Sequence, residues 1–247
     1  MTGGLLEALG LERPQTVAIA GSGGKTTLMY ALAAELGRAG QAVIVTTTTR
    51  IYPPGPDQAA GPWLIGRAVP QRGELASRLA QGSPLCLAAE LNRQGKLTGL
   101  APPQLAALAA AGGWTLVEAD GAAGRPLKGW AEHEPVWPEG AAVVIVVAGA
   151  SALGRPLDQG WVHRPERFAR AAGLGPGRAI TPAAVVRALT GPQGPLRRLP
   201  PGARAVALVN QADAAGEEDL RALERSLADA GAFERVLAMS LRPGPGA

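Results

Sequence analysis

Hydrophobic residues in this chain fall in short continuous runs instead of alternating with polar ones. Such runs are typical of strands in a parallel sheet that helices cover on both faces. The candidate strands are residues 16–20, 42–45, 84–89, 115–119, 143–147, 205–209 and 236–239. Amphipathic segments predict helices at residues 26–39, 73–81, 102–111, 164–172, 181–190 and 217–230. The order of strands and helices predicts a doubly wound α/β fold with a mostly parallel sheet, as in P-loop NTPases.

The length of the chain predicts one domain. Its 247 residues suit a single α/β domain over residues 1–247, or one domain with a small appendage. Two stretches interrupt the pattern: residues 52–62 are rich in Pro and Gly, and residues 121–139 are polar with little periodicity. Because long irregular stretches in a compact domain are usually functional or disordered, we expect residues 121–139 to be a functional insertion. The Pro- and Gly-rich tail, residues 242–247, is expected to be frayed.

Composition narrows the class of protein. The single cysteine, Cys86, lies in an apolar run and predicts a buried thiol in a reducing compartment. The first residues lack the features of a signal peptide, and the longest apolar run, residues 141–150, is about half of a bilayer span. The net charge is +4, but the basic residues are scattered, without a block or a basic and aromatic stripe. We therefore expect a cytoplasmic protein with neither a membrane nor a nucleic-acid partner.

Lysine is rare in a chain that otherwise uses arginine. Of 24 basic residues only three are lysines, at positions 25, 96 and 128. The lysine ammonium is a compact point charge, unlike the planar guanidinium of arginine. Lys25 and Lys128 are therefore candidates for positions where such a charge matters.

The stretch from Val17 to Thr27, VAIAGSGGKTT, has the pattern of a phosphate-binding loop. Glycines let successive N–H groups point at one anion, the helix N-terminus adds its positive end, and Lys25 adds a cation. A threonine hydroxyl can ligate Mg²⁺, and Thr26 is the candidate for that role. The candidate phosphate-binding residues are Gly21, Ser22, Gly23, Gly24, Lys25, Thr26 and Thr27. The stretch predicts a site for a nucleoside triphosphate, ATP or GTP.

This loop is a compact variant. The standard Walker A form has a glycine five positions before the Gly-Lys pair, where this chain has Ile19, still inside the strand. The loop resembles the short phosphate loops of Mur-type ligases more than those of Ras-like GTPases. The alternative is a surface turn without a ligand, but strand, turn and helix stand in the order that a phosphate loop requires.

Polar side chains follow two other predicted strands, at the edge of a parallel sheet where ligands collect. Glu118 and Asp120 end one strand, and alternation puts both on one side, where a carboxylate can hold Mg²⁺. The alternative for Asp120 is a capping or turn residue. Threonines 46–49 end the second strand, where Mg²⁺ or a γ-phosphate would lie, and Thr47 is a candidate Mg²⁺ ligand. Threonine also suits a strand, so packing is an equal alternative.

The irregular polar stretch adds candidates for contact with a second, unidentified small-molecule substrate. Lys128 and His133 are expected to line that side of the site. His133 stands between Glu132 and Glu134, which would raise its pKa and suit it to act as an acid or base; the alternative is a solvated loop histidine. The spacing of His133 and His163 does not predict a zinc site. The candidate catalytic residues are Lys25, Glu118, Asp120, Lys128 and His133.

A further motif near the C-terminus bears on the choice of nucleotide. Residues 210–213, Asn-Gln-Ala-Asp, are close to the Asn-Lys-x-Asp element of GTPases, with Gln211 in place of the lysine. In that element the aspartate accepts both N–H donors of guanine, which adenine cannot supply. Asn210 and Asp213 are therefore candidate nucleotide-binding residues that favour guanine slightly and leave the base open.

Taken together, these motifs resemble the YqeC family. The resemblance spans residues 17–213 and rests on the combination of motifs, since each alone is unspecific. The motifs are residues 20–27, 46–49, 118–122, 126–128, 132–135, 154–157, 162–164 and 210–213. The sequence departs from the family at Ala123, Trp130 and Gln211.

The resemblance implies a nucleotide-binding accessory protein in the maturation of selenium-dependent molybdenum hydroxylases, with such a hydroxylase as its client. Our leading hypothesis is a Mg²⁺-dependent NTPase or nucleotide-activated transferase. A second hypothesis is a non-catalytic carrier or chaperone. It would use nucleotide only as a switch and would transfer a selenium or molybdenum-cofactor species to its client. A third is a Mur-type ATP-dependent ligase, although the chain is short for the further domains of such ligases.

Overall fold

The computed structural model describes residues 4–55, 60–66, 68–80 and 84–241. The predicted frayed tail, residues 242–247, lies outside the described residues, as do parts of the Pro- and Gly-rich stretch and the end of the helix predicted at 73–81. Within the described residues, no helix is both long and apolar enough to cross a membrane.

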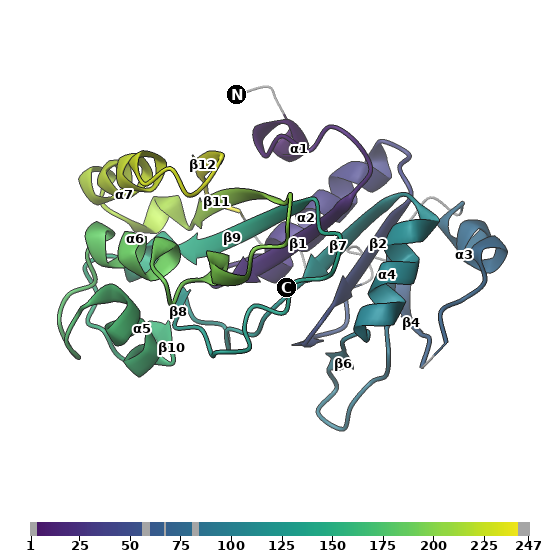
Figure 1. Cartoon of the computed structure of the whole chain (residues 1–247), viewed down its shortest axis with the longest axis horizontal. Helices are drawn as coiled ribbons and strands as arrows, with labels where there is room; N and C mark the ends of the chain where they lie inside the picture. The colour runs from purple at the N-terminus through teal and green to yellow at the C-terminus, as the bar shows by residue number, and fades with distance from the viewer. Residues whose placement is uncertain (1–3, 56–59, 67, 81–83, 242–247) are drawn as a thin grey trace.

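An eight-stranded sheet, parallel throughout, runs through the molecule (Figure 1). Its order is β12-β11-β9-β1-β7-β2-β5-β4. The strands are β1 (Thr16–Gly21), β2 (Val43–Thr47), β4 (Ala60–Leu64), β5 (Leu85–Ala88), β7 (Trp114–Glu118), β9 (Val143–Gly149), β11 (Arg204–Asn210) and β12 (Arg235–Ala238). The α/β fold class and each of the predicted strands are confirmed.

Strand β4 was not predicted, because its residues Gly61 and Pro62 are typical of loops. It lies at the edge of the sheet and pairs with β5, with a register shift between Ala60 and Pro62. An edge strand tolerates proline, since one side of its backbone needs no partner strand.

Helices cover both faces of the sheet (Figure 1). They are α1 (Leu5–Ala8), α2 (Lys25–Arg38), α3 (Arg72–Leu79), α4 (Pro102–Ala111), α5 (Pro165–Ala172), α6 (Pro182–Thr190) and α7 (Glu217–Asp229). All but the single-turn α1 were predicted. The start of α6 follows the expected cap, because the amide of Ala184 donates to the Thr181 hydroxyl at 3.3 Å and Pro182 follows the cap.

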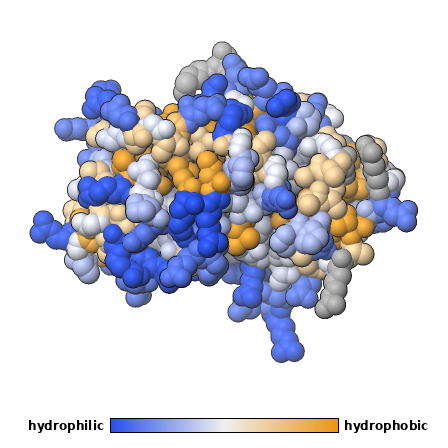
Figure 2. Space-filling model, in the orientation of Figure 1, coloured by the Kyte–Doolittle hydropathy of each residue, from blue (hydrophilic) through white to orange (hydrophobic). Residues whose placement is uncertain are grey.

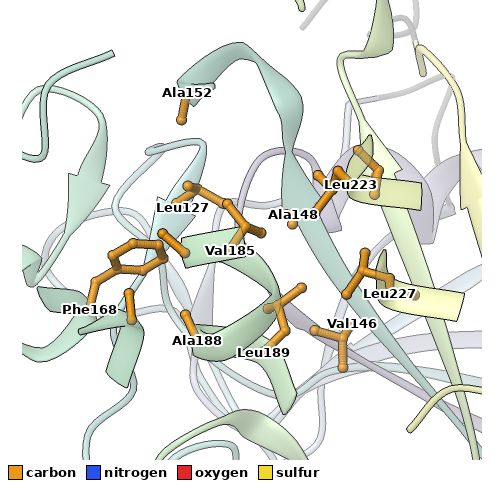
Figure 3. Packing of buried hydrophobic residues seen from close by; sticks show 14 of the residues in the cluster. Leu127, Val146, Ala148, Ala152, Phe168, Val185, Ala188, Leu189, Leu223 and Leu227 are labelled. Atoms are coloured by element: carbon orange, nitrogen blue, oxygen red, sulfur yellow. The ribbon is translucent and has the colours of Figure 1, made fainter. Parts of the chain in front are cut away.

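The core divides by sheet face, as strand alternation requires. On one face Val17 and Ile19 of β1 pack with α1 and α2, whereas Ala18 between them packs on the other face. Figure 3 shows that second face, where α6 and α7 place Val185, Leu189 and other apolar side chains against β9. Cys86 of β5 is buried as predicted, and burial raises the pKa of its thiol to about 12.

Two short two-stranded sheets accompany the carboxyl ends of the large one. β8 (Leu127–Lys128) pairs in parallel with β10 (Val162–His163), and β3 (Arg50–Ile51) pairs in antiparallel with β6 (Leu97–Thr98). Neither pair was predicted, because two-residue strands carry no periodicity. Three short 3₁₀ helices complete the described elements, η1 (Ala150–Ala152), η2 (Pro195–Arg198) and η3 (Ala212–Ala214). The stretch 121–139, expected to be an irregular insertion, thus contributes a strand and several buried residues.

Candidate functional site

The glycine-rich turn between β1 and α2 packs tightly against neighbouring strand ends. Gly21 has a φ of 102°, and a Cβ at this position would lie 2.0 Å from the backbone oxygen of Val147. Gly24 has a φ of 130°, and its Cβ would lie 2.2 Å from Nδ2 of Asn210. Only glycine fits such contacts and backbone angles, so the sequence of the turn is dictated by β9 and β11 beside it.

Amide groups at the start of α2 are left without partners. The amides of Gly21 and Ser22 are used internally, by Asp120 and by the backbone oxygen of Val147. For the amides of residues 23–27, no acceptor exists among the described residues. The first turn of a helix always leaves N–H groups unpaired, and here the helix has no capping side chain. The turn therefore presents several free donors and the positive end of a helix to one place.

Lys25 lies at the same place and is almost fully enclosed. Its Nζ donates to the backbone oxygen of Gly21 at 2.9 Å and lies 3.3 Å from Asp120 and 3.6 Å from Glu118. Burial by itself lowers the pKa of Lys25, but the charges of the two carboxylates outweigh it and raise the pKa above its ordinary value. The side chain is therefore a fixed cation at physiological pH.

Asp120 is fully buried and surrounded by donors. It accepts from the Gly21 amide at 3.0 and 3.1 Å, from Lys128 at 3.0 Å and from the Trp130 indole at 3.0 Å, besides its ion pair with Lys25. It does not border the cleft described below. The structure thus places this candidate Mg²⁺ ligand beneath the loop, where its oxygens are already occupied.

Glu118, two residues earlier, does border the cleft. Its Oε2 accepts from the Thr26 hydroxyl at 2.7 Å, and its Oε1 faces Lys25. Burial raises the pKa of Glu118 above its ordinary value, while Lys25 and the Thr26 hydroxyl act in the opposite direction. Glu118 and Thr26 therefore bring a carboxylate and a hydroxyl together at the start of α2.

The threonines at the end of β2 form a buried pair, Thr46 and Thr47, followed by a pair that lines the cleft. Thr47 is buried, and its hydroxyl donates to the backbone oxygen of Glu118 at 2.8 Å. Thr48 and Thr49 line the cleft instead. The hydroxyl oxygen of Thr48 is enclosed and has no hydrogen-bond partner among the described residues. The structure thus brings Thr48, and not Thr47, to the site.

Lys128 joins the loop to a second pair of charges. Its side chain is fully buried and lies 3.0 Å from Asp120 and 3.1 Å from Glu134. Arg164 also pairs with Glu134, at 2.5 Å. Burial tends to raise the pKa of Glu134, but Arg164 and Lys128 outweigh it and lower the pKa to about 2. Lys128 is therefore a buried connector, without contact to the cleft.

The two histidines lie in different surroundings. His133 is exposed and does not line the cleft, whereas His163 is half-buried and does. Burial, together with the charges of Arg164 and Lys128, lowers the pKa of His163 below its ordinary value. The imidazole at the cleft is therefore neutral at pH 7, and no side-chain partner is found for it among the described residues.

The Asn-Gln-Ala-Asp motif after β11 contacts the phosphate loop through its first residue. Nδ2 of Asn210 donates to the backbone oxygen of Gly23 at 2.7 Å. Gln211 lines the cleft, whereas Asp213 is exposed, lies outside the cleft and hydrogen-bonds with Ser240. The carboxylate of Asp213, which was predicted to recognise guanine, therefore lies away from the cleft.

A cleft of about 1200 Å³ lies over these groups. Its floor is the start of α2 with Glu118, and its walls come from residues 121–125, His163, Gln211 and the β3–β6 pair. Basic side chains that sequence reasoning missed stand on the walls: Arg50, Lys96 and Arg125. The Lys96 ammonium lies 4.8 Å from the centre of the Tyr52 ring. The rarity of lysine, from which only Lys25 and Lys128 were selected as candidates, is the signal that could have identified Lys96.

Strained backbone gathers at this cleft. Among the described residues, the only ones other than glycine with left-handed backbone are Ala123 (φ 48°), Arg164 (φ 58°) and Gln211 (φ 60°). Two of them line the cleft, and Arg164 follows His163, which also does. Such residues cost about 1–3 kcal/mol each and collect at functional sites. Their position supports the cleft as the functional site of the molecule.

Comparisons with known proteins give one family. The model of the family described as "YqeC protein" matches residues 17–166. The chain is 33% identical over 204 residues to the "Uncharacterized protein YqeC" of Escherichia coli (strain K12), covering 81% of this chain and 77% of that protein. No solved structure gives a significant match. The matched residues include the phosphate loop, Glu118, Asp120, Lys128 and His163.

The buried network predicts a large effect for Asp120→Asn. This substitution removes the charge that balances Lys25 and Lys128, and losing one partner of a buried ion pair costs about 3–5 kcal/mol. The free energy of unfolding, measured by urea denaturation at pH 7, should fall by that amount. Glu74→Gln is the control, because it removes an exposed partner of Arg78 at 3.9 Å and should change stability by less than about 0.5 kcal/mol. Equal effects of the two substitutions would contradict the network.

The lowered pKa of Glu134 predicts a pH dependence of stability. Its folded pKa of about 2 lies below the ordinary 4.5, so the stabilisation is complete above pH 4.5 and is lost as the pH falls towards 2. Linkage gives about 3 kcal/mol at pH 7, of which about 2 kcal/mol is lost by pH 3. The stability difference between wild type and Glu134→Gln, from urea denaturation, should therefore shrink from pH 6 to pH 3.

Glu234→Gln is the matched control for that series, because Glu234 pairs with Arg204 on the exposed surface at 2.7 Å. Its difference from wild type should stay nearly constant over the same range. A constant difference for Glu134→Gln as well would show that the carboxyl of Glu134 titrates normally in the folded protein.

Proposed function

The chain belongs to the YqeC family, and from that premise we propose that it is a Mg²⁺-dependent nucleoside-triphosphate-binding protein. The observation that carries the proposal is the group of unpartnered amides at residues 23–27 around the enclosed cation of Lys25. Free N–H groups at a helix N-terminus, together with a lysine, favour the phosphates of a nucleotide. The cleft above them offers room for the rest of the nucleotide.

The residues present fit a magnesium ion. Mg²⁺ prefers oxygen ligands and needs only one or two from the protein, because phosphate and water oxygens supply the rest. Thr26 and Glu118 bring such oxygens to the cleft floor, so we propose them as the ligands in place of Thr47 and Asp120. When bound, the ion would neutralise charge on the β- and γ-phosphate oxygens.

The base is left to experiment, with ATP and GTP both as candidates. Asn210 holds the loop through Gly23, and Gln211 is the residue of its motif that reaches the cleft. Since Asp213 lies outside the cleft, the slight preference for guanine loses its support.

His163 supports turnover over a purely switching role. It lines the cleft in its neutral form, which suits an imidazole for accepting a proton from water or from a second substrate. We therefore propose NTP hydrolysis or nucleotide-activated transfer, with the nucleotide-switched carrier as the other candidate. Binding with negligible hydrolysis until a client protein is added would favour the carrier.

Titration with nucleotide tests the proposal. Isothermal calorimetry with ATP and with GTP, each in Mg²⁺ and in EDTA, should show saturable, Mg²⁺-dependent binding of at least one nucleotide. Thr26→Val removes a hydroxyl that the ion requires and should weaken binding in Mg²⁺ by roughly tenfold or more. Thr190→Val is the matched control, since it removes a hydroxyl bonded within α6, away from the cleft, and should leave affinity unchanged. No saturable binding of either nucleotide below millimolar concentration would refute the proposal.

The resemblance of the motifs to an accessory family extends the proposal to a pathway. We propose that the protein serves the maturation of a selenium-dependent molybdenum hydroxylase. Deleting its gene in a host that makes such a hydroxylase should lower the activity and selenium content of that enzyme. The wild-type gene and Thr190→Val should restore both, and Thr26→Val should not. Full hydroxylase activity and selenium content in the deletion strain would contradict the role.

A further inference from the structure

A second hollow, separate from the cleft, lies between the start of the 130–134 segment, helix α5 and the turn into η2. It measures about 520 Å³ and shares no lining residue with the cleft. It is therefore a site of its own, of a size that suits a small molecule.

Arginine dominates the lining of this hollow. Helix α5 contributes Arg167 and Arg170, which are three residues apart and so lie on one side of the helix. The η2 segment contributes Arg197 and Arg198, and the one carboxylate in the lining is the exposed Glu132. Four positive charges thus face a single negative one. Hydrophilic residues also cover most of the surface at the lower left of Figure 2, where Figure 1 places α5.

Arg197 is held in place by the fold. Its guanidinium donates to backbone oxygens of two of the segments that border the hollow, those of Ala131, Glu132, Glu134, Gln193 and Gly194. Burial lowers the pKa of Arg197, and the charges of Arg198 and Arg167 lower it further, while Glu134 and Glu132 act against this. Arg197 therefore forms a fixed part of the wall, although its positive charge lies close to those of Arg198 and Arg167.

The other arginines are free to bind a ligand. The guanidinium groups of Arg167, Arg170 and Arg198 have no hydrogen-bond acceptor or salt-bridge partner among the described residues. Unpaired like charges repel one another, and an anion between them removes that repulsion. A guanidinium presents its donors in a planar fork that matches the oxygens of phosphate and carboxylate.

We propose that this hollow binds a small polyanion, a molecule bearing phosphate groups or clustered carboxylates. The concave shape and the fixed Arg197 favour a compact ligand, and the free arginines supply its charge recognition. Trp130 forms an apolar wall beside them, because it is buried and its indole N–H is already committed to Asp120. The site stands whether or not the cleft binds nucleotide.

Calorimetric titration with inorganic pyrophosphate, and separately with citrate, tests this site in about 0.15 M salt. The decisive variant is Arg167→Gln/Arg170→Gln, which removes two free arginines and leaves Arg197 in place. Wild-type protein should bind at least one of the probes in this hollow with a dissociation constant below about 1 mM. The double variant should weaken that site by at least about tenfold. The probe that binds tighter identifies phosphate or carboxylate as the preferred group.

The double variant Arg178→Gln/Arg225→Gln is the matched control, because it removes the same charge from residues that are exposed and outside the hollow. It should bind like wild type, and thermal unfolding should show that both double variants are folded. Because pyrophosphate is also expected at the phosphate loop, Thr26→Val and Mg²⁺ removal mark that site: a pyrophosphate site insensitive to both but lost in Arg167→Gln/Arg170→Gln is the hollow. Titrations of wild type and the Arg167→Gln/Arg170→Gln protein that superimpose, or an equal loss in the control, would overturn the proposal.

Discussion

A single buried carboxylate, that of Asp120, organises this site. A buried charge is tolerated only with opposite charges and hydrogen-bond donors around it, and Asp120 obtains them from β1, α2 and the segment after β7. The amide of Gly21, the ammonium groups of Lys25 and Lys128, and the indole of Trp130 all converge on it. Asp120 thereby fixes the shape of the phosphate loop, because it binds both the Gly21 amide at the start of the turn and the Lys25 ammonium of α2.

The neighbouring carboxylate shows how two acids on the same side of a chain take different roles. Sequence alternation placed Glu118 and Asp120 together, and the structure brings both to Lys25. Asp120 comes after the strand has ended, where Lys128 of β8 and Trp130 fold over it. Glu118, still within β7, extends towards Thr26 at the cleft. The contacts that bury Asp120 and leave Glu118 at the cleft come from Lys128 and Trp130. No local sequence pattern predicts how residues 128–130 fold.

The sequence predicted the large elements well because apolar runs and helix periodicity are local signals. It predicted the glycine turn and its lysine for the same reason. It did not predict β4, because Gly61 and Pro62 are typical of loops. It also did not predict the strand pairs β3–β6 and β8–β10, which depend on contacts between distant segments. All three lysines nevertheless belong to the site: Lys25 and Lys96 line the cleft, and Lys128 is buried beneath it. The arginine hollow left no trace in the sequence, since its residues come from separate segments and form no charge block.

Residues 130–134 belong to the stretch predicted to be an irregular loop, yet Trp130, Ala131 and Glu134 are buried. The contacts of this segment explain this burial. Trp130 donates to Asp120, and the side chain of Glu134 holds Lys128 and Arg164. Its backbone oxygens accept from Arg197, so the other side of the same segment forms the wall of the hollow. The carboxylate of Glu134 in this wall is almost fully buried, so it needs internal partners for its charge. Asp120 and Glu134 are each paired with two cations, and these pairs account for the concentration of ion pairs between the cleft and the hollow.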